Sequence, residues 1–139
     1  MTLRRATAVL TIAVACSGLA FNTPATATNS TNSADRAVQS DLRYIANEME
    51  TYFTDHQKYP GSRAITVSGR LVAIGSEPVR LSKSNRLGTI RLTKDRWAFC
   101  VRVVRKADAS ATTRRWSYVS DKGGIMRGGC PARFSKVSA

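Results

Sequence analysis

The stretch from residue 33 to residue 61 has the apolar spacing of one amphipathic helix. Its apolar residues recur at steps of three and four, which places them on one stripe, and polar residues cover most of the remaining surface. The members of the stripe are Val38, Leu42, Ile45, Met49, Tyr52 or Phe53, and His56. Ser33 is a suitable N-cap for this helix, and the sequence Tyr59-Pro60-Gly61 is expected to stop it.

The chain after Gly61 changes to short β-type segments separated by turn residues. Alternation is clearest in residues 97–104, where Trp97, Phe99, Val101 and Val103 share one face and Ala98, Cys100, Arg102 and Val104 share the other. The other expected strands are residues 63–68, 70–74, 79–82, 89–93 and 115–119, with a short one at 125–126. One long N-terminal amphipathic helix packed on a small antiparallel sheet defines the α+β class.

The first 27 residues have the pattern of a secretory signal peptide. Arg4 and Arg5 form the positive region, residues 6–15 the apolar region, and Ala25-Thr26-Ala27 an A-x-A cleavage site. We therefore expect a secreted protein, extracellular or associated with the cell surface. The apolar run is shorter than the ~20 residues of a membrane span, so we expect no transmembrane segment in the mature chain.

Cys16 provides an alternative way of processing the N-terminus. It follows Ala13-Val14-Ala15, which is a degenerate form of the bacterial lipobox, and lipid attachment there would anchor the chain to a membrane. A lipobox usually has Leu at the place of Ala13. The ordinary signal peptide is the preferred interpretation.

Removal of residues 1–27 leaves 112 of the 139 residues, enough for one domain with one core. We divide them into a disordered leader (28–33), an α+β domain (34–131) and a C-terminal tail (132–139). Two cysteines remain, Cys100 and Cys130. An exported protein with a single pair of cysteines most simply forms one disulfide between them.

Four segments of the sequence follow one another in a characteristic order and spacing. They are the helix end Leu42–Pro60, the segment Val79–Ser82 with Asn85, the strand Trp97–Val101, and the stretch from Trp116 through Gly123-Gly124 to Cys130. Together they resemble the soluble part of type IV pilins and type II secretion pseudopilins of the Gram-positive and actinobacterial kind. The resemblance covers roughly residues 36–131 and implies a pilin-like fold with an extracellular structural or partner-binding role.

The N-terminus departs from the pilin pattern. Pilins begin with a long apolar half-helix that contains an early glutamate and holds the subunits in the membrane and in the filament core. Here a secretory signal takes that place, and the chain from Ala34 onward is already amphipathic. The resemblance therefore implies the pilin-like fold, whereas the departure at the N-terminus speaks against filament packing of the usual kind.

The chain shows no pattern typical of catalysis or of metal binding. His56 is the only histidine, and a lone histidine at a helix end is expected to pack or to cap. Three carboxylates share this end of the helix and are expected to form a solvated acidic face: Glu48, Glu50 and Asp55. Ser117 and Ser120 lack a nucleophile-elbow setting. We expect a non-enzymatic protein without catalytic residues, metal ligands or cofactors.

Charge is strongly segregated along the chain. The formal net charge is +13, and it is +11 without the two arginines of the signal. Acidic residues concentrate on the helix, whereas basic residues dominate after it. The preferred interpretation is a solvated surface on a protein that binds an extracellular protein or another cell-surface partner.

The alternative is a polyanion-binding surface for nucleic acid, an anionic cell-wall polymer or lipid head groups. Its candidate residues are Arg102, Arg105, Arg114 and Arg115. The aromatic side chains Trp97, Trp116 and Tyr118 would then offer stacking surfaces. In the preferred interpretation these aromatic residues belong to the core beneath the helix.

Overall fold

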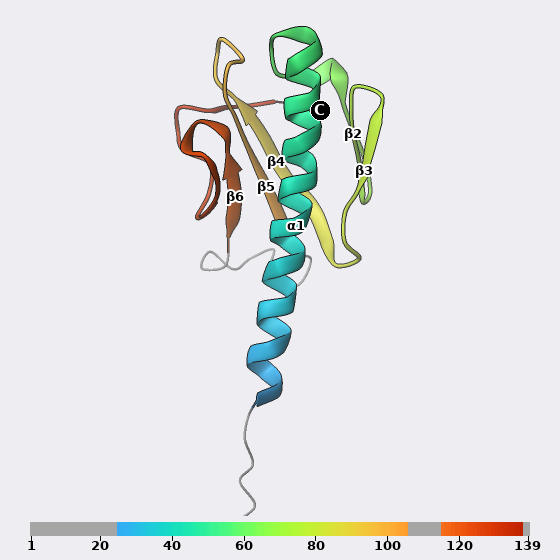
Figure 1. Ribbon diagram of the computed structural model, residues 1–139, viewed down its shortest axis with the longest axis vertical. Helices are drawn as coiled ribbons and strands as arrows, with labels where there is room; N and C mark the ends of the chain where they lie inside the picture. The colour runs from blue at the N-terminus through green and yellow to red at the C-terminus, as the bar shows by residue number, and fades with distance from the viewer. Residues whose placement is uncertain (1–24, 106–114, 138–139) are drawn as a thin grey trace, which may run out of the picture.

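The computed structural model describes residues 25–105 and 115–137 of the chain (Figure 1). Within this range, the side chains are described from residue 33 onward. The greater part of the expected signal peptide, including Cys16, lies outside the described residues, as does Arg114.

One long helix packs on antiparallel sheets, which confirms the α+β class. The helix α1 spans Ala25–His56. The three-stranded sheet has the order β1-β2-β3 and consists of β1 (Ile65–Ser68), β2 (Leu71–Ile74) and β3 (Glu77–Arg80). The five-stranded sheet has the order β7-β6-β5-β4-β8 and consists of β4 (Asn85–Leu92), β5 (Phe99–Arg105), β6 (Trp116–Val119), β7 (Gly124–Arg127) and β8 (Ser135–Lys136). Single turns of 3₁₀ helix occupy Ser62–Ala64 and Ser120–Lys122.

The expectation of one small sheet was wrong, because the strands form two sheets. Helix α1 contacts β2 and β3 of one sheet and β5 and β6 of the other, so it covers both (Figure 1). The structure also describes part of the expected C-terminal tail 132–139. Phe134 is buried there, and β8 returns to pair with β4 at Arg91 and Leu92.

The helix begins earlier than its sequence pattern predicts. It starts at Ala25, whereas the pattern placed an N-cap at Ser33 after a disordered leader. No Pro or Gly interrupts residues 25–33, and a helix that is already held by packing gains one backbone hydrogen bond with each further residue. The N-terminal turns of α1 extend beyond the ends of the strands (Figure 1).

The predicted apolar stripe of the helix is confirmed except at His56. Its central members Leu42, Ile45 and Met49 are completely buried, and they form one core with the inward-facing residues of both sheets. On β5 these inward-facing residues are Phe99, Val101 and Val103, as the alternation predicts. We call this side of the five-stranded sheet its inner face.

Trp97 does not belong to this inner face, contrary to the prediction. It is 59% exposed and makes an edge contact with the ring of Phe53. The reason is local, because β5 begins only at Phe99 and Arg96 has a φ of +63°, which turns the chain just before Trp97. The other two aromatic residues in question, Trp116 and Tyr118, are partly buried against the core.

His56 ends the helix as an exposed capping residue. Its Nδ1 lies 3.0 Å from the carbonyl oxygen of Tyr52, and the two rings stack with their centroids 3.9 Å apart. The following residue, Gln57, has a φ of +56°, which stops the helix. His56 was expected on the apolar stripe, but only its expected role at the helix end agrees with the structure.

Tyr59 connects the helix end to the core. Its hydroxyl donates to both carboxylate oxygens of Glu50, at 2.9 and 3.0 Å, and its ring lies against Phe99. Burial raises the pKa of Tyr59, and the Glu50 carboxylate raises it further. Glu50 therefore has a structural role beyond that of a solvated surface carboxylate, since it accepts these bonds from a buried side chain.

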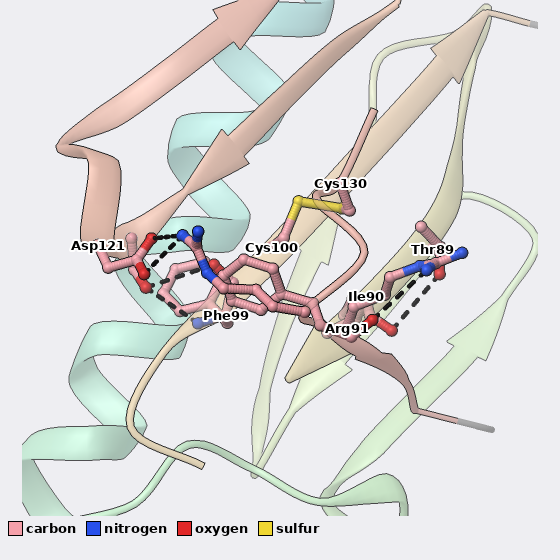
Figure 2. Close-up of a disulfide and its surroundings, with 10 residues drawn as sticks. Thr89, Ile90, Arg91, Phe99, Cys100, Asp121 and Cys130 are labelled. Atoms are coloured by element: carbon pink, nitrogen blue, oxygen red, sulfur yellow. Dashed lines mark hydrogen bonds and ion pairs between the residues drawn. A yellow bond between two sulfur atoms is a disulfide. The ribbon is translucent and has the colours of Figure 1, made fainter. Parts of the chain in front are cut away.

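A second, smaller core lies on the opposite side of the five-stranded sheet, which we call its outer face. It contains Ala98, Cys100, Val119 and Phe134. The predicted disulfide between Cys100 and Cys130 is present there, with the two Cα atoms 5.6 Å apart (Figure 2). The disulfide attaches the segment that leads into β8 to the central strand β5.

The carboxylate of Asp41 joins the helix to the connection between the two sheets. Asp41 is only 2% exposed, and it accepts hydrogen bonds from the backbone N–H and the hydroxyl of Ser82 and from the side-chain amide of Asn85. These donors lie where the chain leaves β3 and enters β4. A buried carboxylate is tolerated here because several donors satisfy it.

The Asp41→Ala variant tests this connection. Removal of the carboxylate leaves the Ser82 and Asn85 donors without their acceptor, so the free energy of unfolding should fall by roughly 2–4 kcal/mol in urea denaturation. Asp55→Ala removes an exposed carboxylate of the same helix and should change stability by less than about 0.5 kcal/mol. Equal effects of the two substitutions would contradict the proposed role of Asp41.

The Met49→Asp variant tests the buried stripe. An unpaired charge at this completely buried position should unfold the domain, seen as loss of the cooperative thermal transition in circular dichroism. Asn47→Asp introduces the same group on the exposed side of the helix and should leave the transition in place. A folded Met49→Asp protein would show that the helix does not need the sheets.

The disulfide should contribute about 3–4 kcal/mol to the free energy of unfolding, because it closes a loop between residues 30 positions apart. The Cys100→Ser/Cys130→Ser double variant should lose that amount in urea denaturation. Wild-type protein kept in a reducing agent should match the variant. An unchanged denaturation midpoint in both would contradict this contribution.

Candidate anion-binding face

The outer face of the five-stranded sheet has an apolar end and a basic end. Alternation places Cys100, Arg102 and Val104 of β5 on this face, opposite the residues that contact the helix. The strand register then assigns the neighbouring positions. Arg91 pairs with Cys100, and Thr89 and Ser117 pair with Arg102 from its two sides.

Three arginines lie on a diagonal across the three central strands of this face. Arg91 is two residues beyond Thr89 on β4, and Arg115 is two residues before Ser117, just ahead of β6. Arg102 lies between them on β5. Diagonal neighbours of this kind are ~7–8 Å apart in an antiparallel sheet. We call Arg91, Arg102 and Arg115 the arginine row.

The members of the arginine row influence one another electrostatically. Burial lowers the pKa of the Arg102 guanidinium from its ordinary value, and the charges of Arg115 and Arg91 lower it further. Arg102 nevertheless keeps its charge, since an arginine in a protein is effectively always protonated. The fold thus holds three positive charges together against their mutual repulsion.

Several polar atoms along the row lack a hydrogen-bond partner. Within the described part of the chain, the buried side-chain nitrogen and oxygen atoms without one are Arg91 Nε, Arg102 Nε and Ser117 Oγ. All three belong to the outer face, and Ser117 is completely buried. A buried polar atom without a partner costs about 1–3 kcal/mol, so a group of three on one face calls for an explanation.

Gly88 makes room for the side chain of Arg102. A Cβ atom at position 88 would lie 3.1 Å from Arg102 Nε and also 3.1 Å from its carbonyl oxygen. Position 88 falls in the irregularity of the β4–β5 register between Leu87 and Thr89. The absence of a side chain there leaves room for the Arg102 side chain against β4 at Gly88.

Carboxylates are absent from the described outer-face positions of β4, β5 and β6. The nearest one in the chain, Asp121, follows β6 and is bound by Arg133 at 2.7 Å. Figure 2 shows Asp121 on the other side of the disulfide from Thr89 and Arg91. The row therefore has no acidic partner on its own face among these residues.

The structure brings together only part of the set that the sequence analysis selected for polyanion binding. Arg102 and Arg115 are neighbours in the row. Arg105 has the opposite alternation and pairs with Asn85, so it does not join them on the outer face. Arg114 lies outside the described residues. Arg91 was not among the predicted residues, because it enters the row only through the pairing of β4 with β5.

The described residues contain no group of three or more His, Cys, Asp or Glu side chains that could hold a metal ion. In the same part of the chain, no helix has both the length and the apolar character needed to cross a membrane. The chemistry that the arginine row offers is that of binding. Guanidinium groups form paired, charge-assisted hydrogen bonds with phosphate, sulfate and carboxylate groups.

No protein-family model matches the chain, and no curated protein or solved structure matches it significantly either. The similarity to pilins thus rests on the four sequence segments.

Proposed function

We propose that this chain is a non-enzymatic extracellular protein of pilin-like architecture whose outer face binds an anionic polymer. The observation that carries the proposal is the arginine row, three cations on one face with no carboxylate at the described outer-face positions of β4, β5 and β6. Like charges held this close oppose folding, and a bound polyanion would remove that cost. This favours the polyanion interpretation, which the sequence analysis ranked second.

Two further features support the extracellular part of the proposal. The Cys100–Cys130 disulfide is typical of exported proteins, because thiols are kept reduced in the cytosol. The first 27 residues have the signal-peptide pattern. The pilin-like part is supported by the long helix on antiparallel strands and by the closing cysteine near the C-terminus.

A second candidate function is that of a structural or partner-binding module, which the sequence analysis preferred. It is favoured by the N-terminal turns of α1, which extend beyond the ends of the strands (Figure 1). Tyr44, on the same helix, is 58% exposed. A protein partner could bind this surface, and the outer face would then have no role in binding.

A salt series distinguishes the two candidates. It measures elution from immobilised heparin and binding to a fluorescent single-stranded oligonucleotide. The logarithm of the affinity should fall linearly with the logarithm of the salt concentration. The Arg102→Ser/Arg115→Ser variant should bind more weakly, and losing two phosphate contacts should reduce the slope by roughly 1.4.

The matched control is Arg63→Ser/Arg80→Ser, which removes the same charge from two exposed positions in or next to the three-stranded sheet. It should retain both the affinity and the slope of the wild type. Equal losses in the two double variants would indicate diffuse attraction by net charge. Weak, unsaturable binding that survives both would favour the protein-partner function.

A further inference from the structure

Strand β4 is paired along only part of one of its two edges. Strand β5 pairs with it over its whole length, whereas β8, on the other side, pairs only with Arg91 and Leu92. The backbone N–H of Val137 adds one hydrogen bond, at 3.1 Å, to the carbonyl oxygen of Ile90. Among the described residues, no strand pairs with residues 85–89 on this side. We call this stretch the free edge of β4.

A cavity of about 240 Å³ lies beside the free edge. Its lining comes from Ile65 and Val67 of β1, from residues 87–90 of β4 and from residues 136–137. Since β1 and β4 belong to different sheets, the cavity lies between the two sheets, and Figure 1 shows β4 on the side nearer to β2 and β3. Small-molecule sites usually measure ~300–1,000 Å³, so this cavity is smaller than such a site and suits a single apolar side chain.

Val67 forms an exposed apolar part of the cavity lining. It pairs with Val72, which is completely buried, so the register places both valines on the core side of the three-stranded sheet. Val67 is nevertheless 40% exposed, and Gly88, which also lines the cavity, is exposed too. The core side of the sheet therefore remains uncovered next to the free edge, where a further chain can pack against it.

An extended peptide fits both the free edge and the cavity. Its main chain can form hydrogen bonds with a strand edge, and every second side chain then points to the same face of the sheet. On the inner face these side chains meet the cavity, which Leu87 and Val67 line. The intervening side chains lie on the outer face with Arg86, the register partner of Val104.

The charges around the cavity favour an acidic partner. Lys136 lines the cavity, Arg86 is exposed on the free edge, and none of the lining residues is acidic. A second copy of this chain is a poorer occupant, because each copy carries a formal net charge of +13 and the two would repel each other.

We propose that the free edge of β4 binds an extended peptide of a partner protein, in which apolar residues alternate with acidic ones. The peptide lies in line with β8, places an apolar side chain in the cavity between β1 and β4, and brings its carboxylates near Lys136 and Arg86. This interaction goes beyond the proposed function, because it uses the main chain of β4 and the cavity in place of the arginine row.

Fluorescence anisotropy with the full-length chain tests the proposal. The probe is a short labelled peptide that alternates leucine with aspartate, and the control peptide has the same composition with its leucines and aspartates in two separate blocks. Both peptides carry the same charge, but only the alternating one presents all its leucines on one face of a strand, so it should bind roughly tenfold more tightly. Equal affinities would overturn the proposal and leave the arginine row untested by this result.

The Val67→Trp variant tests the cavity. It places a large ring beside the cavity without changing the charge, so affinity for the alternating peptide should fall roughly tenfold. Leu71→Trp is the matched control, because Leu71 is 37% exposed and, as the register partner of Ser68, lies on the other face of the same sheet. It should bind as tightly as the wild type. Equal affinities of the two variants would overturn the role of the cavity.

The Lys136→Glu variant tests the preference for an acidic partner. It should weaken binding of the alternating peptide about fivefold, because it reverses the charge beside the cavity. Lys122→Glu makes the same reversal at an exposed position in the turn after β6 and should have little effect. Equal losses in the two variants would indicate attraction by net charge alone and would overturn the proposal.

Amide hydrogen exchange of the wild-type chain provides a measurement that does not depend on any variant. A peptide bound along the free edge should slow exchange within residues 85–89, because it supplies hydrogen-bond partners to the main chain there. Slower exchange confined to other segments would place the peptide elsewhere and overturn the proposal.

Discussion

The carboxylate of Asp41 is the polar contact on which the arrangement of the helix and the two sheets depends. Apolar packing attracts α1 to both sheets, but it has little directional preference. The bonds from Ser82 and Asn85 fix the helix at the point where the chain passes from one sheet to the other. They therefore hold the start of β4, the strand that carries Arg91, against the helix.

The five-stranded sheet also separates charge. Its inner face is covered by a helix that carries most of the acidic residues, including Glu48, Glu50 and Asp55. Its outer face carries the arginine row and no carboxylate at the described strand positions. Since the sheet lies between the two sets, salt bridges across it cannot neutralise the row. The separation of negative charge on the helix from positive charge on the outer face thus follows the layers of the fold.

Local sequence patterns predicted those structural features that depend on the spacing of nearby residues. The steps of three and four in the helix identified Leu42, Ile45 and Met49 as core residues, and one pair of cysteines identified the disulfide. The division into two sheets, the pairing of β8 with β4 and the place of Arg91 depend on the register between distant segments, which no single segment encodes. Trp97 was misplaced for a local reason, because a non-glycine residue at positive φ, here Arg96, leaves no signature in composition.

The pairing of β8 with β4 has a consequence for the order in which the parts of the fold can form during synthesis. Strand β4 lies in the middle of the chain, but one of its neighbours comes from residues 135–136, at the far end. The disulfide of Cys100 likewise cannot form until Cys130 has been synthesised. A chain emerging from its N-terminus can form the helix and the three-stranded sheet early, whereas the larger sheet stays incomplete until residues 130–136 have been synthesised. Long-range closure of this kind slows folding compared with the local pairing of β1, β2 and β3.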